Sequence, residues 1–217
     1  ADLQLRATLE PFRDFKIDLN ATRVSTKARS IQYMYAGRPT TQSGTFSMTT
    51  ISLGSAFEGI GNANSGYHSK TFDRFCNLLD GFRQRVEAQY VGSRYPAGTS
   101  LAGQAFNPNN GTVSRYSADV MVPAFLSAYT SVSGKGLDIF PALTKLLPNW
   151  SVRYSGLVLL PWFRDVFRSF NINHGYRSIY TVGSYASFSS YQEYMNGLGF
   201  VVDATSGNPV PSSMFNV

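Results

Sequence analysis

The side chains that could carry chemistry are few and widely separated. The two histidines, His68 and His174, lie far apart in the sequence, and no serine or cysteine sits in a recognisable nucleophile turn. The single cysteine, Cys76, excludes paired-cysteine metal sites, and its helical neighbours predict a small buried hydrophobe. Carboxylates such as Asp18 have no metal-ligand spacing, and the glycines of residues 54–61 lack the strand-to-helix context of a phosphate loop. The sequence therefore predicts no enzyme, no metal site and no cofactor.

The composition favours a β-rich protein over a nucleic-acid binder. Charged residues make up 15% of the chain and aromatic residues 14%, which suits a barrel with aromatic girdles and also a secreted β-sandwich. The net charge of +6 would suit nucleic acid only if Lys and Arg gathered on one element. The densest basic group is interleaved with acidic residues; it consists of Arg74, Arg83 and Arg85 with Asp73, Asp80 and Glu87. We therefore predict no nucleic-acid partner.

The element that organises the chain is a long alternating segment over residues 170–188. Its even positions are mostly aromatic or aliphatic: Phe170, Ile172, His174, Tyr176, Ser178, Tyr180, Val182, Ser184, Ala186 and Phe188. Because successive strand side chains point to opposite faces, the pattern predicts one strand with an apolar and a polar side. At about 3.3 Å per residue it would span about 65 Å, whereas a tilted crossing of a bilayer needs only about 9–11 residues. This length favours the wall of an outer-membrane barrel.

Other strands follow the same alternation. Residues 3–9 and 15–35 alternate, with a polar stretch over 25–30, and further strands are predicted over residues 46–53, 150–156 and from Phe200. Residues 11–15 and 161–166 have similar sequences, PFRDF and PWFRDV, and each is interpreted as a corner before a strand. Proline cannot donate to a ladder, so Pro11 is expected to end the first strand. Residues 189–199 look like a turn, and the chain is expected to end without a terminal strand.

Period-two patterning disappears between Gly54 and Leu146. Ser69 precedes apolar residues at helical spacing, which predicts an N-cap and a helix over residues 70–89. A shorter helix over residues 118–129 is predicted behind Ser117 or Asp119, and Pro123 in its first turn is tolerated. Residues 97–116 between the helices resemble a loop.

The predicted strands are too few to form a closed β-barrel alone. The sequence supplies about five or six strands, whereas the smallest single-chain barrels need eight, and an open edge in lipid leaves backbone groups unsatisfied. The predicted fold is mainly β: a segment of a large antiparallel transmembrane β-barrel with a helical insertion of about 90 residues. The predicted division is residues 1–53 as barrel strands, 54–146 as an insertion forming a rim, plug or cap, and 147–217 as barrel strands with a connecting loop.

Six aromatic residues are candidates for the membrane interface. Trp and Tyr are enriched at the membrane–water interface. The sequence therefore predicts an aromatic girdle made of Tyr33, Tyr35, Trp150, Trp162, Tyr176 and Tyr180. The alternative is that they form cross-strand pairs in a soluble sheet.

Several motifs resemble a known family. They are EPFRD at residues 10–14, DVMVPAFLSAY at 119–129, LPNW at 147–150 followed by Val152, Tyr154 and Gly156-Leu157, PWF at 161–163, NHGYRS at 173–178, and Tyr180 with Val182-Gly183-Ser184. In order and spacing they are similar to the SprA family, called Sov in some members, the giant outer-membrane barrels of the type IX secretion system of Bacteroidota. The chain, which opens without Met or a signal peptide, looks like an internal segment of such a protein.

The resemblance implies a location and partners. It implies an outer-membrane, cell-surface-exposed translocon for folded secreted cargo proteins, linked to gliding motility. The partners it implies are the remainder of the same barrel, a PorV-like shuttle barrel, a periplasmic plug protein, and lipid or lipopolysaccharide. The alternative interpretation is a soluble β-rich cell-surface binding or adhesion module.

Overall fold

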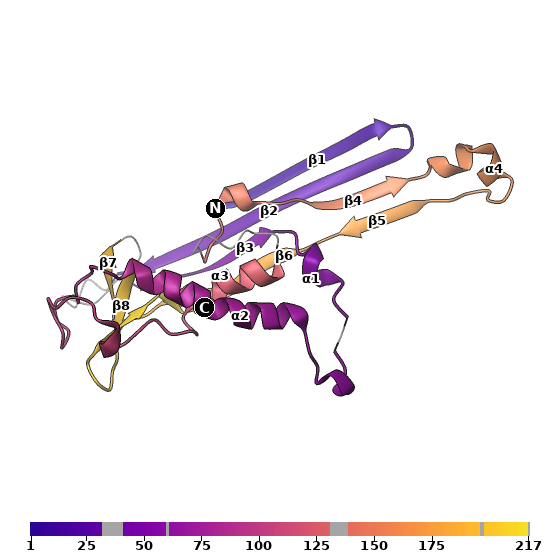
Figure 1. The fold of residues 1–217 in the computed structure, drawn as a ribbon. Helices are drawn as coiled ribbons and strands as arrows, with labels where there is room; N and C mark the ends of the chain where they lie inside the picture. Colours follow the sequence, from indigo (N-terminus) through magenta and orange to yellow (C-terminus); the bar gives the residue numbers. More distant parts are fainter. Residues whose placement is uncertain (32–40, 60, 131–138, 196–197, 217) are drawn as a thin grey trace. The chain divides into compact units, whose positions relative to one another are not determined.

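The computed structural model describes residues 1–31, 41–59, 61–130, 139–195 and 198–216 (Figure 1). More of these residues lie in strands than in helices, and the assigned strand registers are antiparallel. One sheet has the order β10-β6-β3-β2-β4-β5, with β1 also on β2, and a second has the order β7-β8-β9. The chain divides into two units. The first contains Ala1–Ser25, Phe46–Ile51 and Ala142–Thr181, and the second contains Thr26–Thr45, Ser52–Pro141 and Val182–Val217.

A long hairpin forms one side of the first unit. Strands β1 (Asp2–Phe12) and β2 (Phe15–Ser30) pair from Asp2 opposite Val24 to Phe12 opposite Phe15. Arg13 and Asp14 make the turn, and Asp14 takes a positive φ of 64°. Contrary to the expectation from Pro11, β1 continues to Phe12. The register shifts between Leu9 and Phe12, and proline is accommodated in a strand at such irregularities.

Strands β4 (Asn149–Tyr154) and β5 (Ile172–Tyr176) extend the sheet from β2. Between them lie η4 (Gly156–Leu159) and the short helix α4 (Pro161–Arg164), which begins with proline as helices often do. The N–H of Ser155 donates to the carbonyl of Asp14 at 3.0 Å. The two corners with similar sequences therefore lie at the same end of the sheet.

Strands β3 (Thr41–Thr49) and β4 occupy neighbouring positions along one edge of β2. Asn149 lies opposite Asn20, and the N–H of Thr22 donates to Thr49 Oγ1 at 3.1 Å. The N–H of Leu147 donates to the carbonyl of Thr49 at 3.4 Å. The ladder thus passes from β3 to β4 although residues 50–148 separate them in the chain.

The expected long strand over residues 170–188 is divided beside that junction. Strand β5 ends at Tyr176 and β6 (Ile179–Ser187) begins two residues later. Between them, the carbonyl of Ser178 accepts from the N–H of Thr50, and its N–H donates to Asn149 Oδ1 at 2.8 Å. The strand breaks because its partner changes there from β4 to β3.

Two helices dominate the second unit. Helix α2 (Lys70–Gln89) has the predicted bounds, and Ser69 Oγ accepts from the N–H of Phe72 at 3.1 Å, which confirms the cap. Helix α3 (Ala118–Tyr129) is also confirmed; Ser117 is its N-cap residue, but its side chain makes no capping hydrogen bond. Pro123 lies inside this helix and not in its first turn, where it was expected. The short elements are α1 (Leu53–Ala56), η1 (Ala63–Ser65), η2 (Pro108–Asn110) and η3 (Leu143–Lys145). No helix in the described part of the chain is both long enough and apolar enough to cross a bilayer.

The second unit has a hydrophobic core of its own, which includes its small sheet. Strands β7 (Tyr191–Met195), β8 (Leu198–Val202) and β9 (Pro209–Ser212) form this sheet, and β10 (Phe215–Asn216) pairs with β6. Phe200 on β8 is fully buried in one cluster with α2, α3 and the segment between them. The core residues are Leu79, Phe82, Val86, Tyr90, Tyr95, Val113, Val120, Ala124 and Phe200.

The end of the chain therefore differs from the expectation. Residues 189–199 contain β7 rather than only a turn, and β9 and β10 follow where no terminal strand was expected. The apolar residues Leu79, Phe82 and Val86 of α2 are buried in the core that it shares with α3, residues 95–113 and β8, whereas Phe72 near its start is 52% exposed.

Candidate functional site

The first unit carries a continuous row of apolar side chains on one face of its sheet. The register places Leu9 opposite Ile17, Ile17 opposite Val152, and Val152 opposite His174. Because alternate residues share a face, three neighbouring rows join this one. We call the set the apolar face; its members are Leu5, Ala7, Leu9, Phe12, Phe15, Ile17, Leu19, Ala21, Trp150, Val152, Tyr154, Ile172, His174 and Tyr176.

The apolar face is open and the opposite face is polar. Leu5 is 52% exposed and Phe12 56%, and the members on β2 and β4 are mostly half-buried between their neighbours. The opposite face carries Arg6, Thr8, Asp18, Ser151 and Arg153 at the alternate positions of the same strands. A sheet with one half-exposed apolar face is incomplete in water, since monomeric proteins rarely leave large contiguous apolar patches uncovered.

The apolar face ends at Arg23. On β2 the same side continues with Arg23, Ser25, Lys27 and Arg29, and the Arg23 guanidinium lies 5.0 Å from the Phe46 ring centroid. From Phe15 to Ala21 the apolar run rises about 20 Å along the strand, against about 25 Å for the apolar band of outer-membrane barrels. Because barrel strands are tilted by about 35–45°, this run would cover only about 15 Å of barrel height, so the strand portion alone is clearly shorter than such a band.

Aromatic rings gather at two levels of this face. Phe12, Phe15 and Tyr154 meet at the corner end, with the two phenylalanine rings stacked at 4.7 Å. Trp150 and Tyr176 stack at 4.4 Å across β4 and β5. The two levels lie four residues apart on β4, about 13 Å along the strand and about 10 Å in height at the tilt of barrel strands, which is less than half the height of an apolar band. They cannot be the two girdles of one barrel.

The six predicted interface aromatics have different outcomes. Trp150 and Tyr176 come together on the apolar face, and Trp162 on α4 is 67% exposed. Tyr180 is only 8% exposed, and its ring lies 6.1 Å from that of Phe46, so packing covers it in this structure. Tyr33 and Tyr35 lie outside the described residues.

The segment between β4 and β5, which the sequence predicted only as a corner before a strand, adds an apolar surface. Val166 is 73% exposed, and Leu159 and Phe167 are exposed as well. Phe163 holds this corner together, since its ring stacks on Phe167 at 4.8 Å and meets Phe170 edge-on at 5.0 Å. Within the first unit, α4 lies beyond the ends of β4 and β5, so the apolar surface continues past the strands (Figure 1). The signal was the unusual density of apolar residues in 157–170.

Strand β1 also leaves a long edge open. Among the described residues β1 pairs only with β2, and it is exposed on both faces along most of its length. Such an edge presents a row of N–H and C=O groups that invites another strand.

Each of the two histidines has a local neighbour among the described residues. His174 lies on the apolar face with its ring 6.4 Å from that of Trp150, and His68 Nδ1 is 3.0 Å from Asp73 Oδ2 in an exposed pair. No group of three His, Cys, Asp or Glu side chains in the described part of the chain could hold a metal ion.

Comparison with known proteins gives no assignment. No model of a known protein family matches the chain, and no curated protein matches it significantly.

Proposed function

We propose that the chain contributes strands to the wall of a large outer-membrane β-barrel that conducts folded proteins, as in the type IX secretion translocon. The membrane location rests on the open apolar face, with its polar opposite side and the free edge of β1. The transport role rests on the resemblance of the sequence motifs to the SprA family. In this proposal the apolar face meets lipid, the polar face lines the lumen, and further strands continue the sheet from β1.

The single observation that carries the proposal is the sidedness of four adjacent strands. Outer-membrane barrels alternate apolar residues toward lipid and polar residues toward the lumen, which is the pattern of β1, β2, β4 and β5. A soluble sheet would need a covering layer over the same side chains. The second candidate is a soluble cell-surface binding module in which a partner protein provides that layer; the stacked Trp150 and Tyr176 pair would suit such a partner.

The test maps lipid contact along β4. In a Cys76→Ala background, Val152→Cys and Ser151→Cys place a bimane label on opposite faces of the same strand. Val152 pairs with Ile17 and His174, and Ser151 pairs with Asp18 and Gly175. In membranes with brominated lipid, we expect quenching of the label at residue 152 and reaction of residue 151 with a water-soluble thiol reagent.

A matched pair of charges tests the same point energetically. In the full protein, Val152→Arg should lower the stability of the inserted state by about 2–4 kcal/mol, the cost of Arg on the lipid face, whereas Ser151→Arg should change it by less than about 1 kcal/mol. Equal quenching at both labels, together with monodisperse behaviour without detergent, would reject the membrane wall and favour the soluble module.

A further inference from the structure

The apolar face of the first unit is too short to cross a bilayer by its strands alone. Its run on β2 covers about 15 Å of barrel height, whereas the apolar band of an outer-membrane barrel is about 25 Å tall. The missing height of about 10 Å cannot lie beyond Ala21, because Arg23 ends the face on that side. A wall built from this sheet therefore needs further apolar surface at the opposite end, beyond Phe15 and Tyr154.

The segment between β4 and β5 projects from that end of the sheet. Figure 1 places α4 beyond the ends of both strands. One helical turn with its side chains is about 10–12 Å across, which matches the missing height. We call the exposed apolar side chains of this segment the projecting corner; they are Leu159, Leu160, Trp162, Val166 and Phe167.

The backbone of the projecting corner needs few hydrogen bonds from water. Pro161 has no N–H to satisfy. The N–H groups that donate to carbonyls within residues 157–163 are those of Leu160, Phe163, Arg164, Asp165, Val166 and Phe167. A peptide group that enters a bilayer must have such internal partners, since lipid offers none. This backbone can therefore enter a medium that supplies no hydrogen bonds.

Two arginines accompany the apolar side chains. Arg164 and Arg168 are exposed, and neither guanidinium has an ion-pair partner within the described part of the chain. Asp165 lies between them in the sequence, so the segment carries a net positive charge. An arginine at the edge of an apolar surface can keep its stem among acyl chains while its guanidinium binds a phosphate. The charge of the corner thus complements an anionic lipid surface.

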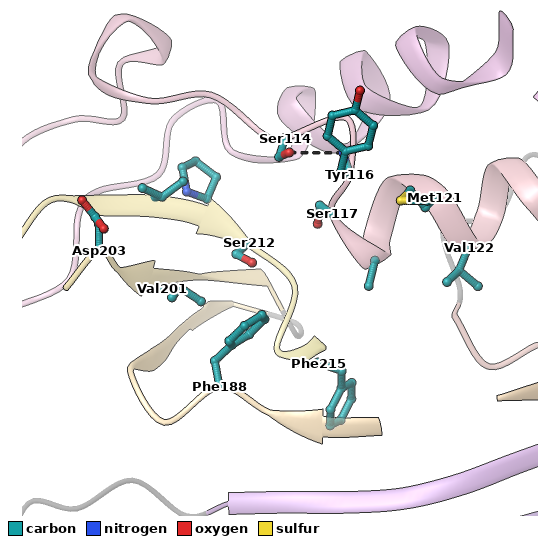
Figure 2. Close-up of a pocket in the computed structure, with 13 residues that line it drawn as sticks. Ser114, Tyr116, Ser117, Met121, Val122, Phe188, Val201, Asp203, Ser212 and Phe215 are labelled. Carbon is teal, nitrogen blue, oxygen red and sulfur yellow. Dashed lines mark hydrogen bonds between the residues drawn. The ribbon is translucent and has the colours of Figure 1, made fainter. Parts of the chain in front are cut away.

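The shape of the projecting corner differs from that of a binding hollow. The second unit has such a hollow, of about 480 Å³, lined by Met121 and Val122 of α3 and by Val201 of β8 (Figure 2). A hollow surrounds a single bound molecule, whereas a projecting turn has no opposite wall. The corner therefore suits a fluid layer that closes around it.

We propose that the projecting corner lies in the interfacial layer of an anionic bilayer. Lipid phosphates bind Arg164 and Arg168, and the upper parts of the acyl chains surround Trp162 and Val166. Tryptophan is enriched at this depth, where acyl chains meet headgroups. This inference rests on the proposed barrel wall and adds to it the lipid contacts and depth of one rim.

The experiment identifies what surrounds Val166. In the Cys76→Ala background, Val166→Cys or Val152→Cys carries a bimane label in the full protein, inserted in vesicles of phosphatidylcholine and phosphatidylglycerol. We expect lipid brominated near the headgroup to quench the label at residue 166 more than lipid brominated near the end of the acyl chain. The label at residue 152, near the middle of the combined height, should show the reverse order.

The possible failures of the corner and of the wall differ. If lipid quenches residue 152 but only aqueous iodide quenches residue 166, the wall stands and the corner inference is overturned. If lipid quenches residue 152 and neither quencher reaches residue 166, a protein partner covers the corner and the inference is again overturned. Iodide quenching at both positions rejects the wall and the corner together.

Two charge-matched double variants test the phosphate contacts. We expect the label at residue 166 to meet brominated phosphatidylglycerol about five-fold more often than brominated phosphatidylcholine, the effect of one net basic charge near an anionic surface. Arg164→Gln with Arg168→Gln should abolish this preference. Arg6→Gln with Arg153→Gln, the same loss of charge on the polar face, should keep it. Lipid quenching at residue 152 checks that each variant is inserted, and a preference that survives the first pair would overturn the phosphate contacts.

Discussion

Replacing Phe200 by alanine should destabilise the helices of the second unit, while the first unit keeps its stability. Phe200 is fully buried, and its ring lies 5.3 Å from those of Tyr90 and Tyr95 and 6.3 Å from that of Phe106. Removing a buried phenylalanine ring typically lowers the free energy of unfolding by about 3–5 kcal/mol. Because Tyr90 Oη also donates to the carbonyl of Gly199 at 2.8 Å, the change weakens the attachment of α2 to β8 as well.

Hydrogen exchange measured by mass spectrometry resolves the two units. A loss of about 4 kcal/mol corresponds to nearly a thousand-fold increase in exchange for the most protected amides of α2, while amides of β1 and β2 before residue 25 should keep their rates. Both tryptophans, Trp150 and Trp162, lie in the first unit, so their fluorescence serves as a second check that this unit is intact.

The control is an exposed aromatic residue of the same small sheet. Tyr194→Ala removes a half-exposed ring from β7 and should change exchange in α2 by less than a factor of about three. Protection of α2 in Phe200→Ala within ten-fold of the native value would refute the conclusion that the helices and β8 share one core.

Two further changes test local features of the second unit. Burial raises the pKa of Asp119 to about 6, so the neutral carboxyl favours folding; this contribution is complete below about pH 4 and is lost as the pH rises to about 6. Urea titrations should therefore show that Asp119→Asn removes a loss of about 2–3 kcal/mol between these pH values, and an unchanged profile would contradict the buried carboxyl. Gly199→Ala would place a Cβ in collision with the Gln192 carbonyl oxygen and should lower the free energy of unfolding by about 1–3 kcal/mol, whereas Gly183→Ala, with nothing within 4 Å, should be much milder. Equal melting temperatures of the two glycine variants would contradict this close approach.

Local patterns in the sequence predicted individual elements well. Ser69 and the apolar spacing behind it marked α2 because a helix start depends on neighbouring residues. The alternation of residues 3–9 predicted β1 and its sides because side-chain direction in a strand is also local. The same alternation predicted the apolar and polar faces of the first unit.

The sequence pattern did not predict the features that depend on contacts between residues far apart in the chain. The break in the strand at Ser178 depends on its hydrogen bonds with Thr50 and Asn149, which lie on either side of the insertion. The residues next to Ser178 in the sequence give no sign of these two bonds. The prolines of β9 argued against a strand, yet its pairing with β8 tolerates them. Tyr180 and Trp150 look alike as aromatic strand residues, and only the surrounding packing makes one buried and the other part of an open surface.

The adjacent positions of β3 and β4 on β2 affect how the segment between these two strands can vary in length. Because the chain leaves and rejoins the sheet at adjacent rungs, the intervening segment can lengthen or shorten without moving any hydrogen bond of the flanking strands. A change in the length of that segment is thereby separated from the alignment of β3 and β4, whereas a replacement of α2 and α3 would also have to cover Phe200 of β8.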